Sequence, residues 1–163
     1  MKKSTSYSLL FLLFIHLVIG GVVFALPFLA KVYSLIIMIY GYSLVIKNKN
    51  NNNEVLIVAA YIVGAEVFLR MSEGGFIHEY SKYNVTVLML IGILYKGFHR
   101  SSYIFLLFLL LLLPGVIVGL LELNYETNIR KVIAFNISGP VCLGVSAWYC
   151  FGKEVSFDQL KKI

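Results

Sequence analysis

One stretch of the sequence decides the class of protein to which this chain belongs. Residues Tyr103 to Leu121, YIFLLFLLLLLPGVIVGLL, contain no charged side chain. The core of a bilayer is about 30 Å thick and requires about 20 apolar residues in a helix, and this stretch meets that length. Across the chain 60% of the residues are hydrophobic and only 13% are charged, which excludes an ordinary soluble domain. The sequence therefore predicts an integral membrane protein, and the absence of polar and apolar alternation favours an all-α fold over a barrel.

Six apolar segments predict a polytopic membrane helix bundle that forms a single transmembrane domain over residues 1–163. Pro27 separates the first two segments, because proline breaks a helix. The first segment resembles a secretory signal, but the apolar character resumes directly after it, which favours an uncleaved first helix. The polar run KNKNNNN, Lys47 to Asn53, is interpreted as a tether. The predicted helices cover residues 7–26, 28–46, 55–73, 79–97, 102–121 and 132–151.

The third and fourth segments are too short to span a bilayer unless they include charged residues. Their uninterrupted apolar runs, Val55 to Ala65 and Val85 to Tyr95, are each about 16 Å long as helices. To cross about 30 Å, the third helix must carry Glu66 and Arg70 into the membrane, and the fourth must extend back towards Glu79. These charged residues are therefore expected to meet at one junction between the two helices.

The 14 Lys and Arg residues divide unequally between the two ends of the predicted helices. Lys and Arg collect on the cytoplasmic side of membrane proteins, so the richer end, which holds both termini, is predicted to be cytoplasmic. The charges lie singly or in pairs between apolar runs, which favours orientation signals over a surface for nucleic acid. The richer end holds Lys2, Lys3, Lys47, Lys49, Lys96, Arg100, Lys153, Lys161 and Lys162, and the outer end holds Lys31, Arg70, Lys82, Arg130 and Lys131.

The strongest polar pattern lies in the third segment and its junction. Glu66 and Arg70 are four residues apart and are predicted to form an ion pair on one helix face, with Glu73 continuing that face. Gly74 and Gly75 are expected to give the junction backbone freedom. One interpretation is a structural ion pair that holds the helices together. The other is a functional site, because an ionisable side chain within a membrane has a high free-energy cost and usually serves a function.

In the functional interpretation, cations of the outer end converge on an anionic group. Arg70 is the first candidate, because a guanidinium group can bond two oxygen atoms of a phosphate at once. Lys82, Arg130 and Lys131 are weaker candidates from the same end. No catalytic motif, cofactor fingerprint or metal site is found in the sequence, so no catalytic residue, cofactor or metal is predicted. His16 is interpreted as structural, because the sequence shows no partner for it.

The segments AAYIVGAEVFLRMSEGG, HEYSKY, AFNISGPVCLGVSAWYCF and KEVSFDQLKKI carry a resemblance to a family. They resemble the N-terminal portion of multi-pass O-antigen ligase and polysaccharide polymerase-like proteins of Bacteroidota. The resemblance implies a location in the bacterial inner membrane and an action on glycans linked to undecaprenyl pyrophosphate, without a nucleotide sugar or a metal. The family's large periplasmic loop with catalytic basic residues has no counterpart in this chain. The resemblance therefore implies a fragment of a larger polytopic protein that is inactive alone.

Two functions follow as expectations. The first is the N-terminal membrane region of an O-antigen ligase or polymerase-like protein in cell-surface polysaccharide biosynthesis, with the bilayer and a lipid-linked oligosaccharide as partners. In this role Arg70, with Lys82, Arg130 and Lys131, helps to bind the pyrophosphate. The second is a small non-enzymatic membrane module, an assembly partner or a transporter component, in which Glu66 and Arg70 hold helices together.

Overall fold

The computed structural model describes residues 3–77, 79–122 and 129–155, which form helices and no strand. The predicted all-α fold is confirmed for these residues. Pro27 separates the first two helices as expected, and the observed ends differ from the predicted ones by one to four residues. The helices are α1 (Lys3–Ala25), α2 (Leu29–Asn48), α3 (Glu54–Met71), α4 (Tyr80–Lys96), the 3-10 helix η1 (Arg100–Ser102), α5 (Tyr103–Glu122) and α6 (Ile129–Cys150).

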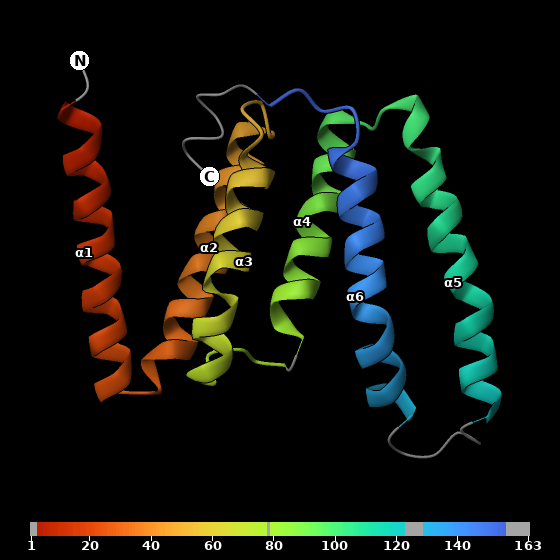
Figure 1. Ribbon diagram of the computed structural model, residues 1–163, viewed down its shortest axis with the longest axis horizontal. Coiled ribbons are helices and arrows are strands. Elements are labelled where there is room, and N and C mark those ends of the chain that lie inside the picture. The colour runs from red at the N-terminus through yellow and green to blue at the C-terminus, as the bar shows by residue number, and fades with distance from the viewer. Residues whose placement is uncertain (1–2, 78, 123–128, 156–163) are drawn as a thin grey trace.

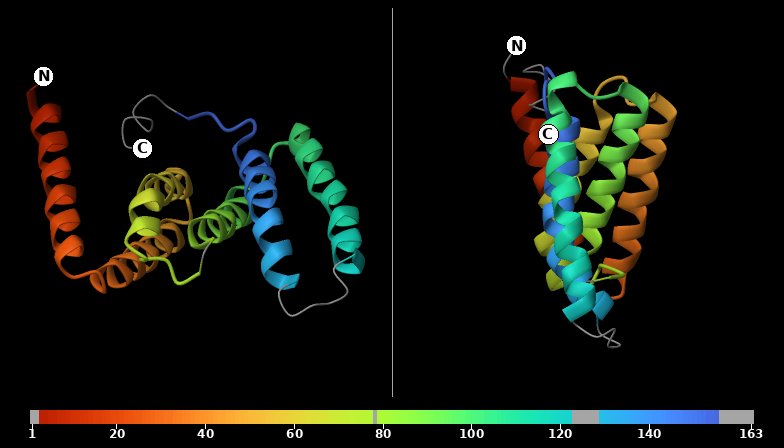
Figure 2. Two further views of the ribbon diagram at one scale, coloured as in Figure 1. Left: turned by 60° about the horizontal axis from the view of Figure 1, so that its bottom comes forward. Right: turned by 90° about the vertical axis from the view of Figure 1, so that its right-hand side faces the viewer.

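The helices stand side by side, and each runs opposite to the helix before it in the chain, so that α4 and α6 run in the same direction, as Figure 1 shows. They form an open row in the order α1, α2, α3, α4, α6, α5, in which each helix contacts its neighbours in the row. Figure 2 shows that the described helices do not close into a compact bundle, with α1 at one end and α5 at the other. We call the end with the start of α1 and the end of α6 the inner end, and the opposite end the outer end.

Among the described residues, three helical segments are long and apolar enough to cross a membrane, which indicates a membrane protein. They are Leu29–Asn48, Arg100–Glu122 and Lys131–Cys150. α5 has no buried residue, and its apolar side chains are exposed except on the face that packs against α6, as expected where a helix faces lipid. α3 carries three charged residues and α4 has only 17 residues, so neither helix by itself is both long and apolar enough to cross a membrane.

The core of the row lies where α3, α4 and α6 meet. Val55 of α3, Leu88 of α4 and Tyr149 of α6 are fully buried there. A Cβ atom on Gly92 of α4 would lie 2.6 Å from Cε2 of Tyr149, so the absence of a side chain at Gly92 allows α4 and α6 to approach. Small residues have this role at many helix contacts in membranes.

The Asn-rich run between α2 and α3 is an ordered part of the inner end, and the prediction of a tether is wrong. Asn50 is fully buried, with its side-chain N–H group donating to the hydroxyl group of Tyr149 over 2.7 Å. Its side-chain oxygen atom accepts a bond of 3.1 Å from the N–H group of Val55 in the first turn of α3. Lys49, Asn50 and Asn53 have positive φ angles, which Asn tolerates better than most residues. The run therefore turns tightly and attaches α2 and α3 to α6.

Two lysine residues complete the inner end. The Lys96 ammonium group donates to the carbonyl oxygen of Asn51 over 2.7 Å. Lys153 follows α6, donates to the carbonyl oxygen of Gly97 over 3.3 Å and lies 5.0 Å from the centre of the Tyr149 ring. Burial, and then the charge of Lys96, lower the pKa of Lys153. These lysine residues are thus structural contacts of the inner end as well as positive charges.

Candidate functional site

The turn between α3 and α4 positions the polar side chains of the outer end. α3 ends at Met71, and the N–H group of Gly74 donates to the carbonyl oxygen of Leu69 over 2.8 Å. The left-handed φ angle of 53° occurs at Glu73, so Glu73 does not continue the helix face as predicted. A Cβ atom on Gly74 would lie 3.0 Å from the carbonyl oxygen of Ala30 in α2. The absence of a side chain at Gly74 therefore allows this turn to pack closely against α2, a role in addition to the expected backbone freedom.

Two ion pairs between described residues lie at this outer end. Within α3, Nη2 of Arg70 donates to Oε1 of Glu66 over 2.7 Å. At the start of α4, Nζ of Lys82 lies 2.5 Å from Oε2 of Glu79. Glu79 is buried and also accepts a bond of 3.4 Å from the hydroxyl group of Ser138 in α6. Arg70 also attracts the Glu79 carboxylate electrostatically, but less than Lys82 does.

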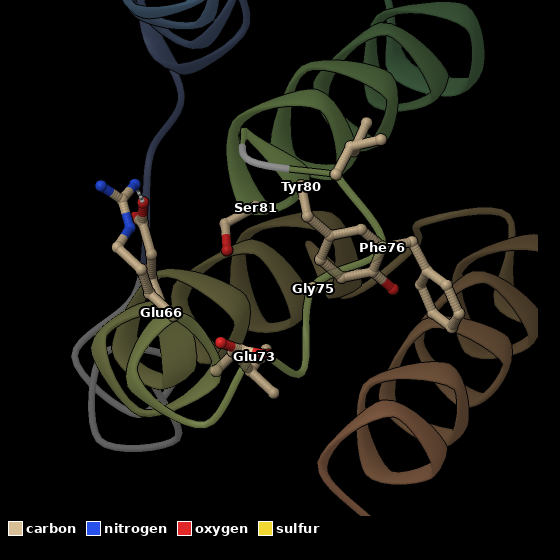
Figure 3. A pocket seen from close by; sticks show the side chains of 9 residues that line it. Glu66, Glu73, Gly75, Phe76, Tyr80 and Ser81 are labelled. Carbon is tan, nitrogen blue, oxygen red and sulfur yellow. Dashed lines mark hydrogen bonds and ion pairs between the residues drawn. The ribbon is translucent and has the colours of Figure 1, made fainter. Parts of the chain in front are cut away.

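A cavity of about 270 Å³ opens between α3 and the start of α4. Figure 3 shows Glu66 on one side of this cavity and the rings of Tyr80 and Phe76 on the other. The centres of these two rings are 5.8 Å apart, and the ring planes are inclined by 55°. The polar and aromatic side chains that line the cavity are those of Glu66, Arg70, Glu73, Ser81, Phe76 and Tyr80. With two carboxylates and one guanidinium group, this polar cavity favours a ligand that can donate hydrogen bonds.

A larger cavity of about 680 Å³ lies between the start of α4 and the first half of α6. Its walls are mainly apolar and include Val132 and Phe135, and Glu79, which is paired with Lys82, also lines it. Lys131 lines it from the first turn of α6 and is exposed. Among the described residues, no acidic side chain forms an ion pair with Lys131. Ile77 lines both cavities, so they adjoin one another.

The structure places the four predicted cations at the same end but in different surroundings. Arg70 and Lys82 are each paired with a glutamate, whereas Lys131 lies beside the larger cavity. Arg130 also lies in the first turn of α6, but its side chain is outside the described residues. Their predicted role in binding a pyrophosphate stays a prediction.

The aromatic part of the site was not predicted from the sequence, in which the charged residues form the stronger pattern. Phe76 and Tyr80 are four residues apart, a spacing that brings side chains together on a helix. The spacing alone does not predict this contact, because α4 begins at Tyr80 and Phe76 lies in the preceding turn, outside the helix. The two rings approach one another through the shape of this turn, which the sequence pattern does not specify.

The remaining chemistry of the site is limited. Among the described residues, no group of three or more His, Cys, Asp or Glu side chains could hold a metal ion. Both cysteines, Cys142 and Cys150, are free. Comparisons with known protein families, curated proteins and solved structures found no match to this chain, so the geometry of the outer end carries the functional argument.

Proposed function

We propose that this chain is a membrane region that binds a lipid-linked anionic glycan at its outer end, as in the O-antigen ligase and polymerase-like proteins that it resembles. In this proposal all six helices cross a bacterial inner membrane, with both termini in the cytoplasm. The Lys and Arg residues of the inner end support this orientation, because they outnumber those of the outer end. The proposal concerns binding, and no residue is assigned a catalytic role.

The observation that carries the proposal is the pair of adjoining cavities at the outer end. One is polar and partly aromatic, and the other is larger and mainly apolar, with a lysine beside it. A glycan carried on a polyisoprenoid pyrophosphate has the same order of parts, with sugar, anionic group and apolar chain in sequence. Ile77, which both cavities share, lies at the junction where the anionic group would pass.

The larger cavity suits the lipid part. Its volume of about 680 Å³ lies within the usual range for ligand sites, and its apolar side chains match an isoprenoid chain. Lys131 would attract the pyrophosphate, because its ammonium group is exposed and has no acidic partner among the described residues. Arg130, the preceding residue, adds a second positive charge to the same turn of α6.

The smaller cavity suits the sugar part. Sugar hydroxyl groups can donate to the carboxylates of Glu66 and Glu73 and accept from the Arg70 guanidinium group. The rings of Phe76 and Tyr80 offer an apolar surface for the C–H faces of a sugar. In this arrangement Arg70 reaches the pyrophosphate only by exchanging its bond to Glu66, so Lys131 is expected to contribute more to pyrophosphate binding.

Photo-crosslinking tests the proposal. The protein in lipid nanodiscs is exposed to a polyisoprenoid pyrophosphate analogue with a photoreactive group on its lipid chain. We expect labelling of α4 and α6 near the larger cavity, and a decrease of about tenfold for Lys131→Glu, because a lost charge-assisted bond costs about 1.4 kcal/mol or more. The matched control is Arg100→Glu, which makes the same charge change at the exposed η1 helix of the inner end.

Two outcomes would contradict the proposal. Labelling that is equal in Lys131→Glu and Arg100→Glu would show that the cation at the larger cavity has no role. Labelling spread over all the lipid-facing helices would show that the analogue behaves as bulk lipid. Arg70→Ala is measured in the same series, and labelling unaffected by this change would remove Arg70 from the site.

The two closed ion pairs favour a second function, a non-enzymatic membrane module. In this case Glu66, Arg70, Glu79 and Lys82 neutralise one another, and the buried Glu79 holds α4 to α6 through Ser138. Neutral clusters of this kind reduce the cost of placing charges within a bilayer. The module would then assemble with a partner or form part of a transporter.

Exchanging the two charges of α3 separates these functions. Glu66→Arg and Arg70→Glu are each expected to lower stability in detergent, because each places two like charges one turn apart. If the pair is only structural, the double variant restores both stability and labelling by the analogue. If the pair binds sugar, the double variant restores stability while labelling by an analogue that carries a sugar stays low. Stability is measured by thermal unfolding in mild detergent.

A further inference from the structure

A chain of three hydrogen-bonded side chains crosses α1, α2 and α3, away from the cavities described above. Nδ1 of His16 lies 2.8 Å from the carbonyl oxygen of Leu12, and Nε2 lies 2.9 Å from the hydroxyl group of Tyr61. The Tyr61 hydroxyl group in turn lies 2.5 Å from that of Tyr33. The three residues belong to three helices, and Tyr61 is the partner of His16 that its sequence context did not show.

The donor and the acceptor of each hydrogen bond in this series follow from the first bond, between His16 and the carbonyl oxygen of Leu12. A backbone carbonyl group can only accept, so Nδ1 of a neutral His16 carries the proton and Nε2 accepts from Tyr61. The Tyr61 oxygen atom then accepts from Tyr33, whose only proton is thereby used. Among the described residues, no group donates to the oxygen atom of Tyr33. The series of hydrogen bonds therefore ends at the oxygen atom of Tyr33, which can accept a further hydrogen bond.

This acceptor lies beside a cavity of about 390 Å³ between the three helices. His16, Tyr33 and Tyr61 line the cavity, together with Phe68 and small residues that include Gly20 and Gly64. Glycine residues in membrane helices usually allow close helix contact. Here a Cβ atom on either glycine would meet no atom within 4 Å, so both leave open space.

The position of the cavity restricts what can enter it. Tyr33 lies in the second turn of α2, near the outer end. His16 and Tyr61 lie nearer the middle of α1 and α3. An occupant must come from the bilayer, because the surrounding helix faces are apolar and exposed. A plain acyl chain would fill the space but leave the Tyr33 oxygen atom without a donor. A lipid with a hydroxyl group would satisfy this acceptor and place its apolar skeleton against the glycines.

We propose that the cavity between α1, α2 and α3 binds a lipid alcohol, whose hydroxyl group donates to the oxygen atom of Tyr33. The site is separate from the outer cavities and does not depend on the glycan function. The aromatic side chains Tyr33 and Phe68, whose rings meet edge to face at 6.0 Å and 83°, form one wall. Both rigid polycyclic alcohols and linear isoprenoid alcohols present the required hydroxyl group on an apolar body.

The test uses the full chain in nanodiscs and two photoreactive probes, a cholesterol derivative and a geranylgeraniol derivative. We expect at least one probe to label α1, α2 or α3 near the cavity. The unlabelled parent alcohol should compete about tenfold better than its methyl ether, because the ether has no hydroxyl proton to donate. The probe that labels identifies the polycyclic or the linear source.

Three variants make the test specific. Tyr33→Phe removes the acceptor but keeps the bond between His16 and Tyr61, and we expect the advantage of the alcohol over the ether to disappear. Tyr95→Phe, at an exposed position of α4, is the matched control and should keep that advantage. Gly64→Leu should abolish labelling by filling the cavity, and its Cβ atom has space.

Three results would overturn the proposal. They are equal competition by alcohol and ether in the original chain, an unchanged advantage in Tyr33→Phe, or full labelling in Gly64→Leu. Circular dichroism of each variant in the nanodisc verifies that the helices are retained.

Discussion

Replacing Gly92 by valine is expected to force α4 away from α6 and to lower the free energy of unfolding by about 1–3 kcal/mol. A Cβ atom at this position would lie 2.6 Å from Cε2 and 2.9 Å from Cζ of Tyr149. The Tyr149 ring is fully buried and its hydroxyl group is bonded to Asn50, so it cannot move without breaking that bond. Gly92→Ala should have the same effect with a smaller magnitude.

The measurement is unfolding of the protein in mixed detergent micelles as the denaturing detergent is increased, followed by circular dichroism. Gly64→Val is the control, because it adds the same side chain to α3 at a position where a Cβ atom meets nothing within 4 Å. A double-mutant cycle isolates the contact, since in a Tyr149→Ala background the ring is absent. A cost of Gly92→Val that is equal in both backgrounds would contradict the assignment.

The number and approximate ends of the helices could be predicted from sequence because they depend on local patterns. The long apolar run of α5 and the break at Pro27 are properties of consecutive residues. The same segments also predict that consecutive connections between helices lie at opposite ends of the helices. The sequence alone therefore places Arg70 and Lys82 at the outer end of the helices and Lys96 and Arg100 at the inner end, as Figure 1 shows for their helices.

The order of the helices in the row could not be predicted, because it depends on contacts between distant residues. α4 packs against α6 and not against α5, which follows it in the chain. The contact requires Gly92 to meet Tyr149, and neither residue has a local pattern that indicates the other. The open row also differs from the expected bundle because α1 and α5 contact few other helices.

In the candidate site, too, contacts between residues close in sequence could be predicted, whereas contacts between distant residues could not. The pair of Glu66 and Arg70 could be predicted from i,i+4 spacing on one helix. The link from Glu79 to Ser138 joins residues 59 positions apart, and the bond between His16 and Tyr61 joins residues 45 positions apart. No periodicity in a single sequence encodes such pairs, so the cavities that they border could not be predicted either.

The composition of the Asn-rich run does not reveal that the run is ordered and partly buried. A run of polar residues of low complexity is typical of a flexible connection, and composition does not distinguish a buried Asn from an exposed one. Asn50 is fully buried, whereas its neighbour Asn51 is exposed. The difference arises because the positive φ angle of 56° at Asn50 turns its side chain towards Tyr149 and the start of α3.

Asn50→Leu is expected to lower the free energy of unfolding by at least about 2 kcal/mol. The change leaves the N–H group of Val55 and the hydroxyl group of Tyr149 without their partner, and one unsatisfied buried group costs about 1–3 kcal/mol. Leucine also lacks the tolerance of Asn for the left-handed backbone, which adds about 1–2 kcal/mol. The same detergent titration measures the effect.

Two further variants separate these causes. Asn50→Gly keeps the left-handed backbone accessible and loses only the side-chain bonds, so its cost should lie between that of Asn50→Leu and zero. Asn51→Ala, which keeps the backbone oxygen atom that accepts from Lys96, should be close to neutral. If Asn50→Leu proves as mild as Asn51→Ala, the run does not attach α2 and α3 to α6. If Asn50→Gly is as costly as Asn50→Leu, the hydrogen bonds account for the whole effect and the backbone conformation contributes nothing.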